Sequence, residues 1–373
     1  MDNQYKGRQW KEADAYEEPQ EEYFDEPDKE SAEDFEEDKV EVIFKDDSYQ
    51  HVPIRHFSEA GFPSGMMAII QSLGFKHPTN IQKHGIPVAM NEFDVIGIAK
   101  TGSGKTLAFI LPGLCKVVEQ MRYCKENGVK FNNRESPSIL VLAPTRELAM
   151  QIYNAALPFT QKLGLYSSVV YGGTNMGQQI KSVRNVDLLI ATPGRLIDLL
   201  SRQVLRLDQV TYFVLDEADR MLDMGFMPQV EEVMNYLTTD RQNLLWSATW
   251  PKEVQILSNK ICINETAKIK VGSDDLTVNK DIEQNIECLE DNEKLAKLFD
   301  ILRDNQTSEV SKNLIFVKTK VWCERLCEIL NNKGINAMAL HGDKSQSVSF
   351  VHAAKRPYRQ GVQKVIPEYT GSH

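Results

Sequence analysis

Short apolar runs recur along the chain after residue 90, and segments with the spacing of amphipathic helices separate them. Each run is nearly continuous, as in Ile139-Leu140-Val141-Leu142-Ala143. Continuous apolar runs are typical of strands covered on both faces, as in a parallel sheet with crossover helices. The pattern therefore predicts a three-layer α/β/α unit with strands over residues 94–99, 139–144, 168–171, 187–192, 211–216 and 243–249.

A polar break, Gly272-Ser273-Asp274-Asp275, is followed by a second and shorter series of the same kind. This series predicts strands over residues 282–289, 313–317 and 335–340, with helices near residues 293–303 and 320–332. A length of 373 residues is enough for two domains. The chain is therefore predicted to hold two α/β units.

The first 47 residues differ in composition from the rest. They contain 19 Asp and Glu against 6 Lys and Arg, so they carry a net charge of −13 while the remainder carries +3. No apolar face recurs there at helix or strand spacing, and we predict that residues 1–47 are a disordered acidic tail. Two interpretations stay open: a solvating spacer, or a polyanion mimic that competes at a basic surface, and protein partners could bind the tail.

The composition also argues against several classes of protein. No apolar run approaches the roughly 18 residues that a membrane helix needs, and the N-terminus lacks the basic and apolar regions of a signal peptide. The six cysteines form no C-x-x-C pair, which favours reduced thiols over a zinc site or a redox dithiol. We therefore expect a soluble intracellular protein, nuclear or cytoplasmic, without membrane contact.

The first predicted strand leads into a glycine-containing loop and then a helix. Glycines in such a loop let successive backbone N–H groups point at a phosphate, and the helix N-terminus adds the positive end of its dipole. Lys105 would reach the β- and γ-phosphates, and the Thr106 hydroxyl would be a Mg²⁺ ligand. The candidate nucleotide-binding residues of this phosphate loop are Ala99, Thr101, Gly102, Ser103, Gly104, Lys105 and Thr106.

A pair of carboxylates follows the predicted strand at residues 211–216. The segment Asp216-Glu217-Ala218-Asp219 would lie at the carboxyl end of a parallel strand, where open α/β sheets bind ligands. Asp216 could hold Mg²⁺, and Glu217 is placed to polarise an attacking water as a general base. Together with Lys105, these two carboxylates are the candidate catalytic residues.

An Asp-Glu-Ala-Asp segment after a phosphate loop of the form A-x-T-G-x-G-K-T resembles the DEAD-box RNA helicases of superfamily 2. Other motifs of that family stand in their usual order, at residues 74–82 (GFKHPTNIQ), 144–149 (PTRELA), 172–173 (GG), 192–195 (TPGR) and 247–249 (SAT). The surroundings of the last motif, Leu245-Trp246-Ser247-Ala248-Thr249-Trp250-Pro251, look most like the p68/Dbp2-like branch. The resemblance covers about residues 50–346.

The resemblance implies roles around the nucleotide. Gln82 is similar to the glutamine whose amide reads adenine and so selects ATP, and Phe75 is the expected stacking surface for the base. Phe57 would pack against this segment or would simply be a core residue. Ser247 and Thr249 resemble the segment that couples the ATP site to RNA through an acidic residue such as Asp219, although Ser247 could instead cap a helix.

The resemblance also implies contacts with RNA. Arginines, hydroxyls and backbone amides freed by glycine recognise phosphate and sugar and read no base edge, so RNA binding is expected to be independent of sequence. The family's discrimination in favour of RNA through the 2′-hydroxyl is not visible in this sequence. The candidate RNA-binding residues are Pro144, Thr145, Arg146, Gly172, Gly173, Thr192, Pro193, Gly194 and Arg195.

The resemblance implies one complete RecA-like domain at residues 48–272, a linker at 273–280 and a partial second RecA-like domain at 281–346. Motifs of the second domain are visible at residues 314–320 (LIFVKTK) and 340–346 (LHGDKSQ), but only 27 residues follow. His352, Arg356 and Arg359 have the offsets of the family's arginine-rich motif, while Lys355 and Tyr358 replace its glycines. Residues 347–373 are therefore either unrelated sequence or a degraded motif joined by an internal deletion.

Three functions are consistent with these observations. The leading one is an ATP-dependent RNA helicase that uses Mg²⁺ and unwinds duplexes locally. The second is an ATP-binding, RNA-interacting fragment with little turnover, because the second domain lacks motifs that would complete the site. The third is a DNA translocase of the same superfamily. An incomplete second sheet would also expose apolar surface near residues 337–340.

Overall fold

The computed structural model describes residues 39–45, 49–129, 136–272, 285–304, 313–341, 343 and 364–369. The chain divides into two compact units, residues 1–277 and 278–373. This division falls inside the segment 273–280 that the sequence suggests as a linker, and the segment itself lies outside the described residues. Most of the predicted acidic tail, residues 1–38, also lies outside them.

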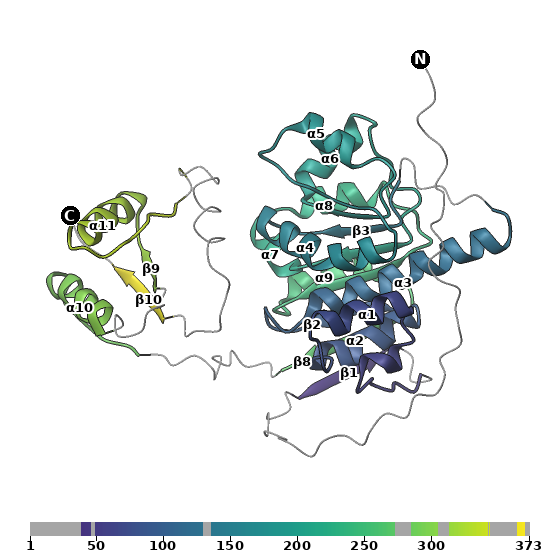
Figure 1. Cartoon of the computed structure of the whole chain (residues 1–373), viewed down its shortest axis with the longest axis horizontal. Coiled ribbons are helices and arrows are strands. Elements are labelled where there is room, and N and C mark those ends of the chain that lie inside the picture. The colour runs from purple at the N-terminus through teal and green to yellow at the C-terminus, as the bar shows by residue number, and fades with distance from the viewer. Residues whose placement is uncertain are drawn as a thin grey trace. The chain divides into compact units, whose positions relative to one another are not determined.

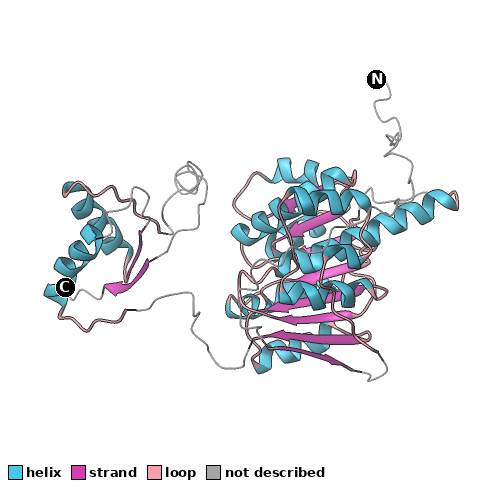
Figure 2. Cartoon of the chain, turned by 60° about the horizontal axis from the view of Figure 1, so that its bottom comes forward, coloured by secondary structure: helices cyan, strands magenta, loops and turns pink. Residues whose placement is uncertain are grey.

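Unit 1 is built on one eight-stranded sheet whose order is β1-β8-β2-β7-β6-β3-β5-β4. All neighbouring strands are parallel except β1, which is antiparallel to β8 at the edge. Figures 1 and 2 show helices on both faces of this sheet. The strands are β1 (Val40–Phe44), β2 (Asp94–Ile98), β3 (Ile139–Leu142), β4 (Ser167–Val170), β5 (Leu188–Ala191), β6 (Tyr212–Leu215), β7 (Gln242–Ser247) and β8 (Thr266–Val271).

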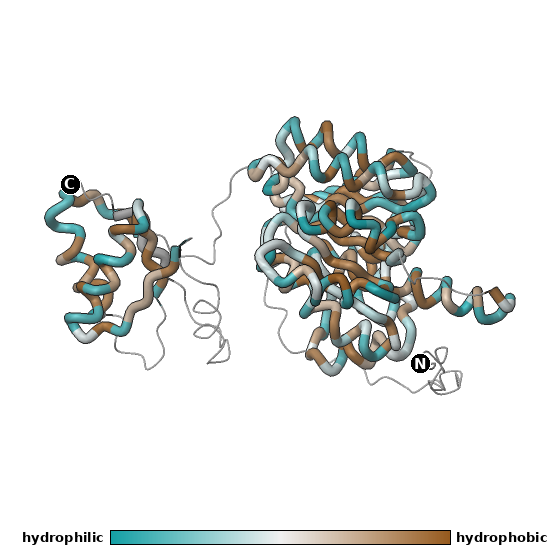
Figure 3. The backbone as a smooth tube through the Cα atoms, turned by 90° about the horizontal axis from the view of Figure 1, so that it is seen from above, coloured by the Kyte–Doolittle hydropathy of each residue, from teal (hydrophilic) through white to brown (hydrophobic). Residues whose placement is uncertain are grey.

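Successive residues of the central strands enter two different cores, one on each face of the sheet. In β3, Ile139 and Val141 belong to one core, whereas Leu140 and Leu142 belong to the other. Figure 3 shows the hydrophobic segments gathered in the middle of the unit. The covering helices are α1 (Ser64–Ser72), α2 (Asn80–Met90), α3 (Lys105–Glu126) and α4 (Arg146–Lys162) for the first core, and α5 (Met176–Ser182), α6 (Pro193–Ser201), α7 (Ala218–Asp223), α8 (Met227–Met234) and α9 (Lys252–Ile261) for the second.

The six strands predicted for unit 1 are all present, within two residues of the predicted bounds, and the α/β/α fold is confirmed. Local capping explains several helix starts. Thr145 accepts a hydrogen bond from the Leu148 N–H (3.2 Å), and Thr79 and Gln82 form a reciprocal capping box at the start of α2. A short 3-10 helix, η1 (Phe57–Ala60), precedes α1.

The predicted disorder of residues 1–47 is wrong for residues 40–44, because these residues form β1. Val40, Val42 and Phe44 alternate with Glu41 and Ile43, which is the period of a strand with one buried face. The partner β8, which the sequence analysis missed, alternates Ala267 and Ile269 with lysines. Glu41 pairs in register with Lys270, so opposite charges face one another across the two strands.

Unit 2 is smaller in the part that the structure describes. It contains α10 (Asp291–Asp304), β9 (Asn313–Val317), α11 (Lys320–Asn332) and β10 (Lys364–Tyr369), with β9 and β10 paired in parallel. Its buried core consists of Leu298, Leu302, Leu326 and Leu330. The two predicted helices and the strand at 313–317 are present.

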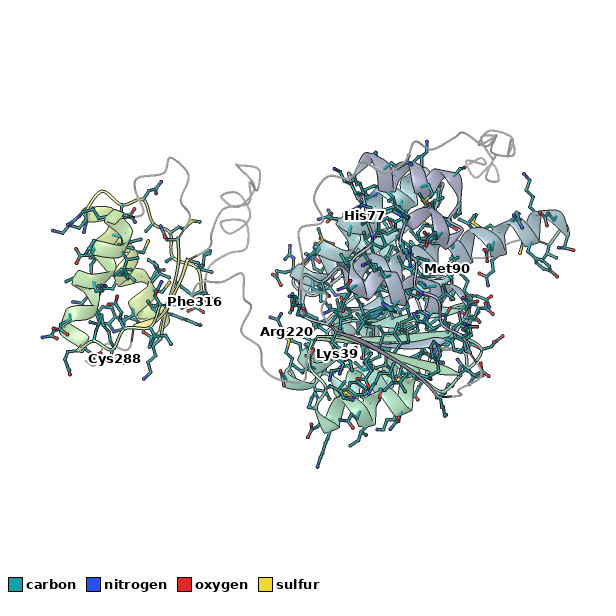
Figure 4. The ribbon with its side chains drawn as sticks, turned by 90° about the horizontal axis from the view of Figure 1, so that it is seen from below. Lys39, His77, Met90, Arg220, Cys288 and Phe316 are labelled. Carbon is teal, nitrogen blue, oxygen red and sulfur yellow. The ribbon has the colours of Figure 1, made fainter. Side chains whose placement is uncertain are left out.

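Two strands predicted for unit 2 are not observed. Residues 335–340 form no strand, because the Asn331 side chain bonds both backbone groups of Ala337, donating to its carbonyl (3.0 Å) and accepting from its N–H (3.2 Å). The described part of the predicted strand at 282–289 is also irregular. Met338 and Leu340 are exposed as expected, Ala339 is buried, and Phe316 on β9 is half exposed (Figure 4).

None of the helices in the described ranges is long and apolar enough to cross a membrane.

Candidate functional site

The phosphate loop connects the carboxyl end of β2 to the first turn of α3. Gly102 and Gly104 have φ values of +82° and +93°, a region that side chains other than glycine rarely adopt. The Lys105 ammonium lies over the loop and donates to the carbonyls of Ala99 (2.5 Å) and Lys100 (3.2 Å). The loop therefore curls around a cationic group that is almost entirely buried.

The donors of this loop fit a phosphate chain. The first turn of α3 presents N–H groups and the positive end of a long helix. The Ser103 hydroxyl oxygen is buried and has no hydrogen-bond partner among the described residues. A Cβ atom on Gly104 would come within 2.6 Å of Gln82 Nε2, so this close approach requires glycine. Thr106 lies next to Lys105 in the same turn and is half-buried.

Asp216 and Glu217 follow β6 at the same edge of the sheet. The Asp216 carboxylate is buried and accepts a hydrogen bond from the Glu217 N–H (2.9 Å). Burial raises the pKa of Asp216 to about 6, although Lys105 and this N–H favour its ionised form. Burial likewise lowers the pKa of Lys105, against the opposing effect of Asp216. The two groups are thus close enough to influence each other's charge.

Glu217 has a backbone conformation that is rare for its residue type. Its φ of 51° and ψ of 54° lie in the left-handed region, directly before α7. Strained backbone of this kind is found at functional sites, where it fixes the direction of a side chain. The Arg220 guanidinium lies 3.3 Å from the Glu217 carboxylate and holds it from the next turn. The sequence analysis did not identify Arg220, because an i, i+3 ion pair in a helix is too common to stand out.

Asp219 joins α7 to the segment after β7. One of its carboxylate oxygens accepts three hydrogen bonds, from the Ala248 N–H (3.2 Å), the Thr249 N–H (2.9 Å) and the Thr249 hydroxyl (2.8 Å). The Ser247 hydroxyl in turn accepts a bond from the Asp219 N–H (3.3 Å), which is an N–H of the first turn of α7. The Ser247 hydroxyl therefore contacts the first turn of α7 and joins it to the end of β7.

The first turn of α2 reaches the phosphate loop through Gln82. The Gln82 side chain is buried, accepts from the Thr79 N–H (3.0 Å) and donates to the Gly104 carbonyl (2.9 Å). Its amide retains a second N–H and a second lone pair, which are the groups that an adenine edge would need. Phe75 is exposed at 42%, as a stacking surface requires, whereas Phe57 is buried in the core.

The candidate RNA-binding residues follow the carboxyl ends of β3, β4 and β5. These strands lie side by side in the sheet, and their carboxyl ends form the same edge that carries the phosphate loop and Asp216. Pro144 and Pro193 are buried, while Gly172, Gly173 and Gly194 are exposed and a Cβ atom at any of the three glycines would meet nothing within 4 Å. Thr145 and Thr192 are the N-cap residues of α4 and α6.

The two arginines of this set are held in different ways. The Arg146 guanidinium stacks on the Tyr171 ring, with its central carbon 4.5 Å from the ring centroid. Arg195 donates to the Gln179 side chain (2.7 Å) and to the Thr174 carbonyl (3.3 Å), so it anchors the turn between β4 and α5. Tyr171 and Gln179 were missed by the sequence analysis, since a lone tyrosine and a lone glutamine form no pattern.

Comparison with known proteins decides the family. Residues 79–257 match the family described as DEAD/DEAH box helicase. A DEAD box protein from the hyperthermophile Methanococcus jannaschii has a similar structure, with 33% identity, a TM-score of 0.51, and coverage of 81% of this chain and 77% of that one. The chain belongs to the DEAD-box helicase family.

Two further relatives show which branch of the DEAD-box family the chain resembles. It is 46% identical over 296 residues to DEAD-box ATP-dependent RNA helicase 30 of Arabidopsis thaliana, covering 79% of this chain and 48% of that protein. It is 43% identical to ATP-dependent RNA helicase DBP2 of Vanderwaltozyma polyspora, covering 79% of this chain and 65% of that protein. The similarity to Dbp2 confirms the predicted branch. The chain spans about half to two thirds of the length of these relatives.

The RNA helicase Prp28 from Chaetomium thermophilum, solved with ADP, also has a similar structure. It is 32% identical, with a TM-score of 0.54 and coverage of 87% of this chain and 75% of that one.

Proposed function

We propose that this DEAD-box chain binds ATP with Mg²⁺ at the phosphate loop and couples its hydrolysis to sequence-independent binding and local unwinding of RNA. The observation that carries the proposal is the convergence of Lys105, Asp216 and Glu217 on one edge of the sheet, with the candidate RNA-binding residues on the same edge. Relatives at 43–46% identity are named ATP-dependent RNA helicases.

Each residue has a distinct part in this proposal. Lys105 would leave the carbonyls of Ala99 and Lys100 to neutralise the β- and γ-phosphates, and the loop N–H groups would bind phosphate oxygens. Thr106 and Asp216 would hold Mg²⁺, which supplies charge neutralisation to the phosphates when bound. Glu217 would orient the attacking water and take up its proton.

The coupling between bound ATP and bound RNA would run through Asp219. Its three hydrogen bonds tie Glu217, two residues earlier, to Ala248 and Thr249 after β7. A shift of α7 would therefore move the segment after β7 as well. We infer that Asp219, Ser247 and Thr249 transmit the state of the nucleotide to the RNA-binding part of the edge.

A second function, ATP and RNA binding with little turnover, is favoured by one observation. The described part of unit 2 has a core of only four buried leucines and leaves Leu314 and Phe316 of β9 half exposed. In this case both ligands would bind unit 1, but unit 2 would not complete the catalytic site. We propose an intracellular location, nuclear or cytoplasmic, for either function.

RNA-stimulated ATP hydrolysis separates the two functions. If the chain is a helicase, adding single-stranded RNA should raise its hydrolysis rate at least tenfold over a Glu217→Gln variant measured in parallel. A rate equal to that of the variant, with ATP affinity retained, would reject the helicase and support the binding function. Greater stimulation by DNA than by RNA would contradict both and favour the DNA translocase.

A further inference from the structure

A basic groove of about 720 Å³ lies beside the first turns of α2, and its lining contains none of the candidate catalytic, ATP-binding or RNA-binding residues. The first described residues of the chain, the loop before η1 and the first turns of α2 line it. Its ionisable lining side chains are Lys39, Arg55, His56, His77, Lys83 and His84. No carboxylate belongs to this lining, so we call it the basic groove.

The positive charge of the basic groove is not neutralised within the described part of the chain. The structure shows no carboxylate paired with the side chains of Lys39, Arg55 or Lys83, and the nearby Glu59 accepts only from the backbone N–H of Arg55 (2.8 Å). Lys39 and Arg55 are exposed and Lys83 is half-buried. Three cations close together without partners favour a ligand of opposite charge.

Histidines form part of the wall of the basic groove. The His84 and His51 rings share a 2.8 Å hydrogen bond. Burial lowers the pKa of His84 to about 4, and the charges of His51 and Lys83 act in the same direction. The rings of His56, which precedes η1, and His77, which precedes α2, lie 5.2 Å apart. The cationic side chains that the basic groove offers an anion are Lys39, Arg55 and Lys83.

The position of Lys39 identifies a ligand within the same chain. Val40 pairs with Val271, and the Lys39 carbonyl accepts from the Gly272 N–H (3.0 Å), so residue 39 is fixed at the carboxyl edge of the sheet. The preceding residues, 1–38, contain 16 acidic and 4 basic residues, a net charge of −12. Within residues 12–38, Lys29 is the sole basic residue against 15 acidic ones.

We propose that the acidic residues 12–38 bind in the basic groove of the same molecule. Residue 38 is joined directly to a residue that lines the groove, so the effective concentration of the acidic segment there is on the order of millimolar. Opposite charges at short range supply the attraction, which salt weakens. An acidic ligand in the groove would lie against Asn80 and Lys83, on the same helix as Gln82, which bonds the phosphate loop. The acidic segment would therefore be placed next to the adenine-reading segment.

Zero-length coupling of carboxylates to lysines by a carbodiimide tests this contact in the full chain. Lys39 and His77, two residues of the groove lining, are labelled in Figure 4. Lys39 adjoins acidic residues in sequence, so the informative site is Lys83. We expect coupling of Lys83 to residues 12–38 within single chains, at least fivefold above coupling of the exposed Lys162 on α4, and its loss in 0.5 M salt. Arg55→Glu should reduce the Lys83 products at least fivefold.

A matched charge reversal provides the control. Arg122→Glu changes an exposed arginine on α3 that pairs with Glu126, and it should leave the Lys83 products unchanged. Three results would overturn the proposal: coupling of Lys162 equal to that of Lys83, products found only between two chains, or Lys83 products insensitive to Arg55→Glu. Products between chains would assign the groove to a second copy, and displacement of the coupling by RNA alone would assign it to phosphate.

Discussion

The bonds of Gln82 permit a sharp test of how the first turn of α2 supports the phosphate loop. Gln82→Glu keeps the oxygen that accepts from the Thr79 N–H but replaces the NH₂ donor with an oxygen facing the Gly104 carbonyl. One hydrogen bond worth about 1 kcal/mol is lost, and leaving a carboxylate and a carbonyl unpaired at a buried site costs about 1–2 kcal/mol more. We therefore expect the free energy of unfolding to fall by about 2–3 kcal/mol.

Urea denaturation at pH 8 measures this change, and a fall of about 5–10 °C in melting temperature should accompany it. The matched control is Gln71→Glu, because Gln71 is exposed on α1 and should change stability by less than about 0.5 kcal/mol. Nucleotide binding provides a second readout, since Gln82→Glu should also lose the preference for ATP over GTP. If both glutamine variants were equally stable, Gln82 would not support the phosphate loop.

Three further perturbations have expected outcomes. Gly97→Ala would place a Cβ atom 2.2 Å from the Trp246 ring, so urea denaturation should show a loss of about 3 kcal/mol or more, and an unchanged midpoint would contradict the packing. Thr249→Val removes one of the three bonds to Asp219 and should lower RNA stimulation of hydrolysis severalfold while ATP affinity stays within twofold; equal losses of both would argue against coupling. The pKa of His84 in the folded chain is about 4, below its ordinary value of 6.5. The unfolded chain therefore binds a proton at this ring more readily, and the free energy of unfolding should fall as pH drops from about 6.5 to about 4. The half-buried ring limits this loss to about 1 kcal/mol, and His84→Gln should remove it; identical pH profiles for both proteins would refute the assignment.

The central strands could be predicted from the sequence because both faces of the sheet are covered there. Leu140 and Val141 lie on opposite faces and both are buried, which leaves an uninterrupted apolar run. The edge strand β1 and its neighbour β8 were missed for the opposite reason. In β8, lysines occupy the partly exposed face, and in β1 acidic residues on both sides obscured the alternation of Val40, Val42 and Phe44. A strand with one partly exposed face carries polar residues on that face, so its apolar residues form no continuous run.

The meeting of the phosphate loop with Asp216 and Glu217 on one edge of the sheet could be predicted, because unusual residue types stand there in a fixed order after two strands. Supporting residues were not, because their roles depend on three-dimensional neighbours. Gln179 holds Arg195 across 16 positions of sequence, and Arg220 fixes Glu217 through a pair type that occurs on many helices. Residues 335–340 illustrate the same limit, since two hydrogen bonds between the Asn331 side chain and the Ala337 backbone stand where strand pairing was expected.

The most direct test of the central claim is the Mg²⁺ dependence of ATP binding, measured with a fluorescent ATP analogue on the full chain. The account predicts that chelating Mg²⁺ weakens binding at least tenfold, that Lys105→Ala weakens it to a similar degree, and that Lys100→Ala, at the exposed neighbouring lysine of the loop, stays within twofold of the parent. Binding that is indifferent both to Mg²⁺ and to the loss of Lys105 would contradict the assignment of this edge of the sheet as a nucleotide site.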